Sequence, residues 1–370
     1  CLPQACDEET DTCSDCIYDE DCDDQNVCTD DTCNAGACEY SYNTASCDDG
    51  LFCTLTDACV DGVCTGSGDP CTLLVFVDDA TSTLELSNAE LNEITAASLT
   101  IGDATSGDIN LTASILTLPA TGSVLLTSAG TVSDGVSGSF SSGINLAVLA
   151  DGDIVLDNAS NNFGNVSLTS TSGDVTMVDS SFASIGRVAV NGMNYDGASG
   201  NNIDVMATTG NLSVSRDILA NGTLQLSAQA TDATFSLGSN RTITGTSGAH
   251  TYTADRMNIA SDANINAGAQ RVTLQSSSIG RAVDLGSITD IAVNTLELSS
   301  TELARITADT LATGSATAGA ISVSSSITPS NINNLHLISN STVTGTGGIR
   351  GNKNLAISTA SSVDLRNNDV

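Results

Sequence analysis

Residues 83–115 read TLELSNAELNEITAASLTIGDATSGDINLTASI, and residues 295–327 read TLELSSTELARITADTLATGSATAGAISVSSSI. The two stretches align without a gap, and 18 of their 33 positions are identical. Apolar residues alternate with polar ones between short turns, which is typical of half-buried β-strands. The identical positions are mainly aliphatic residues and glycines, the residue types of cores and corners. The repeat therefore predicts a duplicated structural unit rather than a duplicated catalytic site.

The same alternation of apolar and polar residues between short turns extends from about Leu73 to the end of the sequence, in runs such as GDIVLDN, GTLQLSA and RVTLQS. Aromatic residues make up 3% of the chain and tryptophan is absent, which disfavours a β-sandwich core. Small aliphatic residues stack well when each coil repeats the one below, and Asn and Ser can form ladders at corners. We therefore expect an all-β fold in which residues 73–370 form a parallel right-handed β-solenoid (β-helix) of about 10–15 coils. Residues 89–97 are the exception and predict one helical turn or a bulge.

The N-terminal segment is of a different kind, because all thirteen cysteines lie between Cys1 and Cys71. A segment this short and polar buries little apolar surface, so residues 1–72 predict a small, disulfide-rich and mostly irregular acidic repeat module. Two units with similar cysteine spacing span residues 22–38 and 47–64. Cys1 is expected to pair with an upstream module or to be lipidated. The twelve cysteines expected in disulfides are Cys6, Cys13, Cys16, Cys22, Cys28, Cys33, Cys38, Cys47, Cys53, Cys59, Cys64 and Cys71.

Cysteine content and charge both bear on the compartment and the partners. Disulfides persist in oxidising surroundings, so the chain is expected to be extracellular or on the cell surface. It carries 44 acidic against 10 basic residues, and no Lys or Arg precedes Arg187. This field repels nucleic acid, which we exclude as a partner, and it disfavours anionic membranes. No apolar run is long enough for a transmembrane helix.

Two resemblances follow from these patterns. The motif C-D-D-x3-C-T-x-D-x-C of the cysteine units resembles the small extracellular cysteine-rich repeats of slime-mould matrix proteins and of secreted myxobacterial proteins. The alternating texture of residues 73–370 resembles the shafts of filamentous-haemagglutinin-like and autotransporter-type β-helical exoproteins. The first resemblance implies an extracellular spacer or matrix module, and the second implies a secreted or surface-attached adhesin or fibre.

Metal binding is considered for the acidic turns. Asp19, Asp21, Asp23 and Asp30 occupy positions 1, 3, 5 and 12 of an EF-hand-like loop, but Asp24 stands where that loop needs glycine. We keep these four carboxylates as a candidate calcium site, beside the alternative that they are solvated turn residues. A zinc site is not expected, because the C-x2-C pair of residues 13–16 has no second pair or histidine at suitable spacing. No other cofactor is expected.

The sequence predicts no catalytic residues. His250 and His336 are the two histidines, and each lies in an alternating run typical of a strand. A polysaccharide-cleaving β-helix would need paired carboxylates in a groove, and the candidates Asp151, Asp153 and Asp157 lie together at one corner. No basic residue near them in the sequence would hold an acidic sugar. The chain is therefore expected not to be an enzyme, and the polysaccharide-cleaving alternative is the less favoured one.

These observations together predict an extracellular structural or adhesive protein. The cysteine module is expected to cap the edge of the solenoid or to dock onto a neighbouring subunit, so the partners would be further copies, a matrix or a surface. The alternative is a calcium- or glycan-binding surface module. Seven N-x-S/T sequons also occur in this Asn-, Ser- and Thr-rich chain, at Asn110, Asn158, Asn165, Asn211, Asn221, Asn240 and Asn340.

Overall fold

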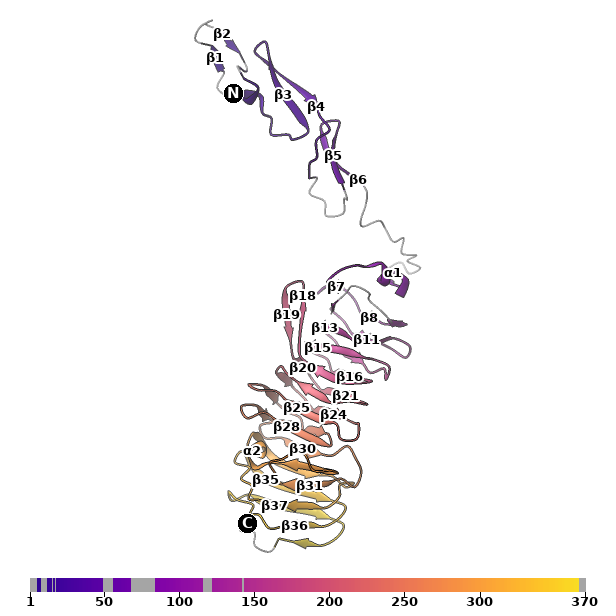
Figure 1. The fold of residues 1–370 in the computed structure, drawn as a ribbon, viewed down its shortest axis with the longest axis vertical. Coiled ribbons are helices and arrows are strands. Elements are labelled where there is room, and N and C mark those ends of the chain that lie inside the picture. The colour runs from indigo at the N-terminus through magenta and orange to yellow at the C-terminus, as the bar shows by residue number, and fades with distance from the viewer. Residues whose placement is uncertain are drawn as a thin grey trace. The chain divides into compact units, whose positions relative to one another are not determined.

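The computed structural model describes residues 5–7, 12–14, 16, 18–48, 56–67, 84–115, 122–141 and 143–365. Contacts divide the chain into two compact units, Cys1–Ser87 and Asn88–Val370. The expected boundary between residues 72 and 73 lies outside the described residues, and so do Cys1, Cys53 and Cys71. The strands and helices of both units are drawn in Figure 1.

The described residues of the N-terminal unit form three antiparallel hairpins and one 3-10 turn, η1 (Asp19–Cys22). The unit therefore has more regular structure than the mostly irregular module that the sequence predicts. The reason lies in two turns, at residues 35–36 and 61–62, where both central residues have positive φ. Such turns match the twist of paired strands and favour hairpins. The strands are β1 (Ala5–Asp7), β2 (Thr12–Ser14), β3 (Thr29–Asn34), β4 (Ala37–Tyr42), β5 (Thr56–Val60) and β6 (Val63–Ser67).

The second unit is a parallel β-solenoid of about 12 turns, as expected. Its strands stack coil upon coil and pair in parallel register (Figure 1). The long ladder contains β7 (Ser98–Ile101), β8 (Ile109–Asn110), β10 (Ser123–Ser128), β11 (Val132–Ser133), β13 (Ile144–Ala150), β14 (Ile154–Leu156), β15 (Phe163–Ser170), β16 (Val175–Asp179), β17 (Ala183–Ile185), β20 (Ala198–Gly200), β21 (Ile203–Ala207), β22 (Leu212–Val214), β23 (Ile218–Ala220), β24 (Leu224–Ala228), β25 (Thr234–Leu237), β26 (Thr242–Gly245), β27 (His250–Thr253), β28 (Arg256–Ile259), β29 (Asn264–Asn266), β30 (Arg271–Gln275), β33 (Ile306–Gly314), β35 (Ile332–Ser339) and β37 (Asn354–Thr359).

Smaller sheets complete the coils. Strands β9 (Ser114–Ile115) and β12 (Ser139–Phe140) form a parallel pair. A second parallel sheet contains β31 (Ala282–Leu285), β32 (Thr295–Leu298), β34 (Ile321–Val323), β36 (Val343–Gly345) and β38 (Val363–Asp364).

The core of the solenoid is a set of interior stacks in which one inward residue of each coil lies over the equivalent residue of the next. Alternation places every second side chain of a strand inside, so parallel register puts like on like. One stack is aliphatic throughout except for a single histidine. Its members are Ile109, Val132, Ile154, Val175, Ile203, Leu224, His250, Val272, Leu311, Leu335 and Leu355.

Polar ladders hold the corners, as the Asn and Ser content predicts. Asp153 Oδ1 accepts a hydrogen bond from the backbone N–H of Asp174 at 2.8 Å. Asp174 Oδ1 accepts one from the N–H of Asn202 at 3.0 Å, and Asn202 Oδ1 accepts one from the N–H of Thr223 at 2.8 Å. Each side chain therefore satisfies a backbone donor of the following coil, which a bend in the strand would otherwise leave unpaired.

The two copies of the internal repeat fold alike from the helix onward, whereas their first residues differ: Leu296 is buried in β32 and the equivalent Leu84 is exposed outside any strand. Helix α1 (Asn88–Glu93) opens the first copy, and helix α2 (Ser300–Leu303) lies at the equivalent place in the second. The helical turn predicted within residues 89–97 is therefore confirmed. Strands β7 and β8 of the first copy align with parts of β33 and β34 in the second. Duplication of packing residues thus reproduces the helix and the two strands that follow it.

One antiparallel hairpin departs from the coils. Strands β18 (Arg187–Val190) and β19 (Met193–Asp196) lie beside β13 and β15 (Figure 1). Val188 and Val190 bury themselves against Leu125 and Ala147, which point outward from the solenoid. The hairpin therefore covers an apolar patch on the outside of the solenoid.

Candidate functional site

The candidate calcium residues of the N-terminal unit bind the local main chain. Asp19 Oδ1 accepts from the backbone N–H of Cys33 at 2.8 Å, and Asp23 Oδ1 accepts from that of Gln25 at 2.8 Å. The bond of Asp23 spans two residues and is typical of an Asx turn, whereas the bond of Asp19 ties η1 to strand β3. They leave other carboxylate lone pairs open to solvent or to a cation.

The other two candidates are similarly engaged. Asp21 Oδ2 accepts from the N–H of Tyr18 at 3.0 Å, and Asp30 Oδ1 accepts from Asn43 Nδ2 at 2.9 Å. Within the described residues, the groups of three or more ligand-type atoms lying within 4.8 Å of one another consist of cysteines. Calcium binding by these turns stays a prediction.

Four disulfides define the described part of the module. They join Cys16 to Cys33, Cys22 to Cys38, Cys28 to Cys59, and Cys47 to Cys64. These four disulfides contain eight of the twelve cysteines that the sequence predicts to be paired. Cys6 and Cys13 face each other across β1 and β2 by backbone register. Cys16 is held by Cys33, so its sulfur is not a thiolate that would bind zinc.

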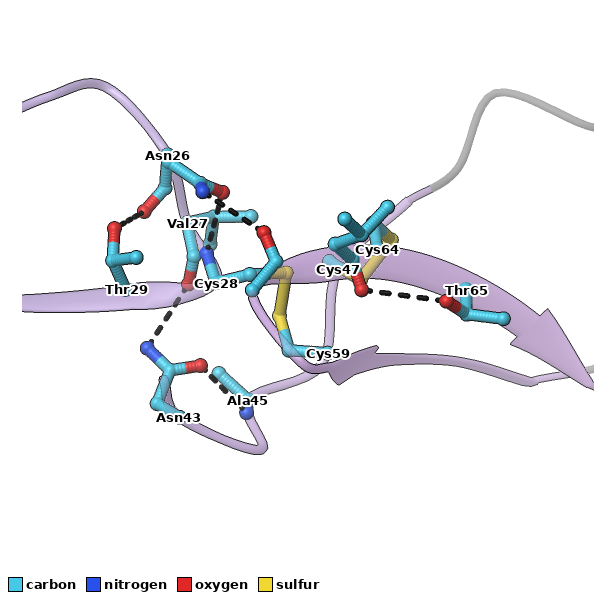
Figure 2. The surroundings of a disulfide bond; sticks show 12 residues. Asn26, Val27, Cys28, Thr29, Asn43, Ala45, Cys47, Cys59, Cys64 and Thr65 are labelled. Atoms are coloured by element: carbon cyan, nitrogen blue, oxygen red, sulfur yellow. Dashed lines mark hydrogen bonds between the residues drawn. A yellow bond between two sulfur atoms is a disulfide. The ribbon is translucent and has the colours of Figure 1, made fainter. Parts of the chain in front are cut away.

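The Cys28–Cys59 disulfide links one cysteine unit to the next (Figure 2). Hydrogen bonds reinforce this junction: Asn26 Nδ2 donates to the carbonyl of Gly62 at 3.0 Å, and the N–H of Cys59 donates to the carbonyl of Ala45 at 3.0 Å. Cys28 and Cys59 are almost fully buried although most of the surrounding unit is exposed. The two cysteine units, residues 22–38 and 47–64, are therefore coupled by a buried disulfide.

The residues proposed for a polysaccharide-cleaving enzyme take part in coil contacts, Asp153 through its carboxylate and the other two through their main chain. Asp153 belongs to the corner ladder described above. The N–H of Asp157 donates to Asp134 in the preceding coil, and the carbonyl of Asp151 accepts from Ser172 in the following one. All three residues thus lie at coil-to-coil contacts through which the solenoid is built.

His336 and Ser358 form the arrangement that most resembles a nucleophile with its base. His336 Nε2 lies 2.9 Å from Ser358 Oγ on neighbouring strands β35 and β37. On the other side, both terminal nitrogens of Arg271 lie 3.4 Å from His336 Nδ1. A guanidinium can only donate, so Nδ1 accepts and Nε2 carries the proton. The imidazole therefore donates to Ser358 and does not withdraw its proton.

The pKa of His336 supports the same assignment. Partial burial and the neighbouring Arg271 charge both lower the pKa of the imidazole below its usual value. Histidine is consequently neutral at pH 7, with one protonated nitrogen. In a catalytic triad the third group is an acceptor that orients the base toward the nucleophile. Here a cation occupies that position.

His250 lies inside the solenoid, at the single non-aliphatic position of the stack described above. Its Nδ1 lies 3.2 Å from the hydroxyl of Tyr252, the next inward residue of β27. The ring occupies space that only glycine leaves free, because a Cβ on Gly245 would overlap the imidazole. Burial lowers the pKa of His250 to about 4. The residue is thus a partly satisfied core histidine, as the strand pattern predicts.

An ion network that the sequence does not reveal lies among three coils. Arg281 Nη1 lies 3.0 Å from Asp255 Oδ2, and its Nη2 lies 2.7 Å from Asp232 Oδ1. Arg281 and Asp255 are almost fully buried. Burial alone would raise the pKa of Asp255, but hydrogen bonds from Ser278, from the N–H of Asp232 and from Ser277 hold it below its usual value. The three charged residues, Asp232, Asp255 and Arg281, are 23 to 49 positions apart, so no local motif links them.

Two shallow grooves cross the outer faces of the solenoid, with volumes of about 360 and 520 Å³. The first lies over β20, β23 and β26, and the second over β34, β36 and β38. Hydroxyl and carboxylate side chains dominate the second groove, which is lined by Ser322, Val323, Ser324, Thr344, Gly345, Thr346 and Asp364. Such a surface offers hydrogen bonds to a polar, extended ligand.

The chain is similar in part to Protein psiQ of Dictyostelium discoideum. The two are 41% identical over 73 residues, which amount to 19% of this chain and 7% of psiQ. The match therefore spans a small fraction of that relative's own length. The chain matches no family model, and no solved structure matches it.

These comparisons bear on the resemblances drawn from the sequence. The likeness to psiQ fits the expected slime-mould link, and the solenoid fits a β-helical exoprotein. Membership in the filamentous-haemagglutinin or autotransporter families stays a prediction. A search of the described residues finds no helix with the length and apolarity needed to span a membrane. The solenoid with its cysteine-rich module is consistent with an extracellular structural or adhesive role.

Proposed function

We propose that the chain is an extracellular structural or adhesive protein whose solenoid serves as a shaft. The observation that carries this proposal is the continuity of coil-to-coil pairing from β7 to β37. In a solenoid each coil contacts its neighbours, so stiffness and reach grow with the number of coils. The disulfides of the N-terminal unit support a location outside the reducing cytosol.

We also propose that the chain is not an enzyme. Of the groups that could support catalysis, the Asp153 carboxylate is engaged in a coil-to-coil bond, His250 lies in the core, and His336 lies beside a cation. A general base must accept a proton from its target, and His336 donates instead. The supporting observation is the 3.4 Å approach of Arg271 to His336 Nδ1.

The location is tested by immunogold labelling of intact, unpermeabilised cells. Label on surface or matrix material is expected, whereas label that appears only after permeabilisation would overturn the extracellular proposal. A chain with Cys28 and Cys59 both replaced by Ser serves as a matched control for the module. This variant lacks the disulfide between the two cysteine units. It should reach the same location, provided that the other three disulfides form.

We further propose that the solenoid associates end to end with other copies of the chain. Within the described residues β37 pairs on one side alone, with β35, and such an open edge can accept another strand. Electron microscopy of purified protein is expected to show end-to-end filaments. Ile357→Lys places a charge in the interior stack at this edge and should shorten them, whereas Ala356→Lys, on the exposed face, should not. A monodisperse monomer in the unmodified protein would refute the filament.

Glycan binding is the second candidate function, favoured by the hydroxyl-rich groove over β34, β36 and β38. Sugar hydroxyls are satisfied by Ser, Thr and Asp side chains of this kind. Thr344→Ala combined with Thr346→Ala should abolish binding on a glycan array if the groove is used. The matched control is Thr209→Ala, on an exposed turn away from the groove. Unchanged binding in the groove variant would remove this candidate.

Calcium binding by the acidic turns of the N-terminal unit is the other alternative function. Titration of Ca²⁺ against the purified protein should raise the melting temperature of the N-terminal unit if the acidic turns bind it. Asp19→Asn combined with Asp23→Asn should remove that rise. A melting temperature that does not depend on Ca²⁺ would eliminate the metal.

A further inference from the structure

We infer that Asn221, Asn240 and Asn340 carry N-linked glycans, whereas the other four sequons of the solenoid remain bare. This inference rests on the proposed export of the chain. The sequence alone does not separate the seven sites, because each has the same Asn-x-Ser/Thr pattern. The separation comes from how each amide is used in the fold.

The three proposed sites lie at the ends of strands and are exposed. Asn221 follows β23 directly, Asn340 follows β35 directly, and Asn240 lies in the turn between β25 and β26, where its φ is 56°. In the described part of the chain, no hydrogen-bond partner is found for any of these three side-chain amides. A glycan attached to Nδ2 would therefore extend into solvent without breaking a contact.

The other four side-chain amides are engaged in hydrogen bonds, mostly to the next coil. Asn165 Oδ1 accepts from Ser184 Oγ at 2.8 Å, and Asn211 Oδ1 accepts from the N–H of Thr234 at 2.8 Å. These bonds fix the plane of the amide against the neighbouring coil, which lies only about 4.8 Å away. The remaining two bonds run from Ser133 Oγ to Asn110 Oδ1 and from Asn158 Nδ2 to the carbonyl of Val136.

Asparagines that do not begin a sequon show what an amide engaged through Nδ2 does in this fold. Asn145 Nδ2 donates to the carbonyl of Gly122 at 3.1 Å, and Asn202 Nδ2 donates to Asp174 Oδ1 at 3.0 Å. Neither residue begins a sequon. A sugar in place of either hydrogen would remove a rung of the ladder. The contrast indicates that ladder positions and glycan positions are distinct uses of asparagine in this fold.

The modification is a balanced transfer. The donor is an oligosaccharide linked through pyrophosphate to a membrane polyprenol. A bond forms between Asn Nδ2 and sugar C1, while the C1–O bond to the pyrophosphate breaks and the lipid pyrophosphate leaves. One amide proton is lost to the transferase. The threonine two residues on, which is Thr223, Thr242 or Thr342 here, is the part of the sequon that the transferase recognises.

The test uses protein recovered from the extracellular medium of its native source. Deglycosylation with a peptide amidase in ¹⁸O-labelled water converts each occupied asparagine to a labelled aspartate, which peptide mass spectrometry then locates. Label at residues 221, 240 and 340, and none at the other four sequons, is expected. Exported protein without label at these three sites would overturn the inference, and so would equal occupancy at Asn158. A chain absent from the medium would instead refute the proposed location.

A pair of variants separates glycan loss from misfolding. Thr342→Ala destroys the sequon of Asn340, and Thr342→Ser preserves it while changing the same side chain. The Ala variant should lose one glycan in intact mass and the Ser variant should keep it. Equal masses of the two variants after enzymatic removal of glycans, corrected for the substitution and for conversion of Asn340 to Asp in the Ser variant, would confirm that the difference is carbohydrate. Equal glycan content before removal would overturn Asn340 as a site.

Discussion

The N-terminal unit and the solenoid are each built from repeats, and one repeat has a similar number of residues in both. The forces that join one repeat to the next are different. The two cysteine units begin 25 residues apart and are joined by the Cys28–Cys59 disulfide. Neighbouring coils of the solenoid are joined by parallel backbone hydrogen bonds, interior stacks and corner ladders. The difference follows from composition: among the described residues of the N-terminal unit, the buried apolar side chains are those of cysteines.

The comparison teaches that repeat geometry and repeat stability are separate properties. Turns with positive φ shape the hairpins of the first unit, and disulfides hold them. In the solenoid, alternation shapes the strands and burial holds them. Each stabilising force can therefore be removed without touching the other region, which gives a direct test of the comparison.

Reduction should produce the largest difference. A disulfide in a small domain contributes about 2–4 kcal/mol, so loss of four should unfold the N-terminal unit. The solenoid has no cysteine between residues 72 and 370, so its unfolding should not change. Limited proteolysis with and without reductant should show new cleavage confined to residues 1–67. New cleavage inside the solenoid would contradict the division.

Truncating a stacked core side chain should come next in size. Leu226→Ala removes a fully buried rung between Val205 and Tyr252 and should lower the free energy of unfolding by about 2–5 kcal/mol. Leu219→Ala, on an outward position with 44% exposure, should cost far less. Urea unfolding followed by circular dichroism measures both. Equal losses would mean that the interior stacks do not carry the stability of the solenoid.

Acidification should weaken the solenoid through His250. Folding lowers its pKa to about 4, so below about pH 6.5 the unfolded chain binds a proton that the folded chain resists. The contribution is fully present above pH 6.5, declines toward pH 4 and is then constant, with a total of about 3 kcal/mol. Burial raises the pKa values of Asp134 and Asp179, which act in the opposite direction at lower pH.

The variant His250→Leu isolates this effect, because leucine continues the aliphatic stack and does not titrate. The difference in unfolding free energy between the two chains should change by about 3 kcal/mol from pH 7 to pH 4. Chemical denaturation at a series of pH values measures it. A difference that does not vary with pH would show that the imidazole is not buried as a neutral group.

How much the sequence predicts depends on the range of the signal. Alternating runs and the duplicated segment predict the solenoid, and cysteine spacing predicts a disulfide module. Each of these signals can be seen in the sequence alone, because the residues that make it are a few positions apart or occur in two copies that align. The salt bridge of Arg281 with Asp255 and the disulfide connectivity were not predicted, because each depends on which residues the fold brings together. The hairpin of β18 and β19 was also missed, since its strands alternate like every other strand.

The hairpin offers the smallest and most local test, because it is part of the solenoid unit without being part of a coil. At its turn, Ser98 Oγ lies 2.7 Å from Asn191 Oδ1 and accepts from the N–H of Asn191 at 3.2 Å. Ser98→Ala removes both bonds without straining the turn and should cost about 1 kcal/mol, equivalent to an about fivefold rise in local opening. Hydrogen exchange of residues 187–196 measures this opening. Asn194→Ala, which removes an exposed side chain on the same hairpin, should leave exchange unchanged. If both variants exchange alike, the turn contact does not hold the hairpin, and burial of Val188 and Val190 alone accounts for its position.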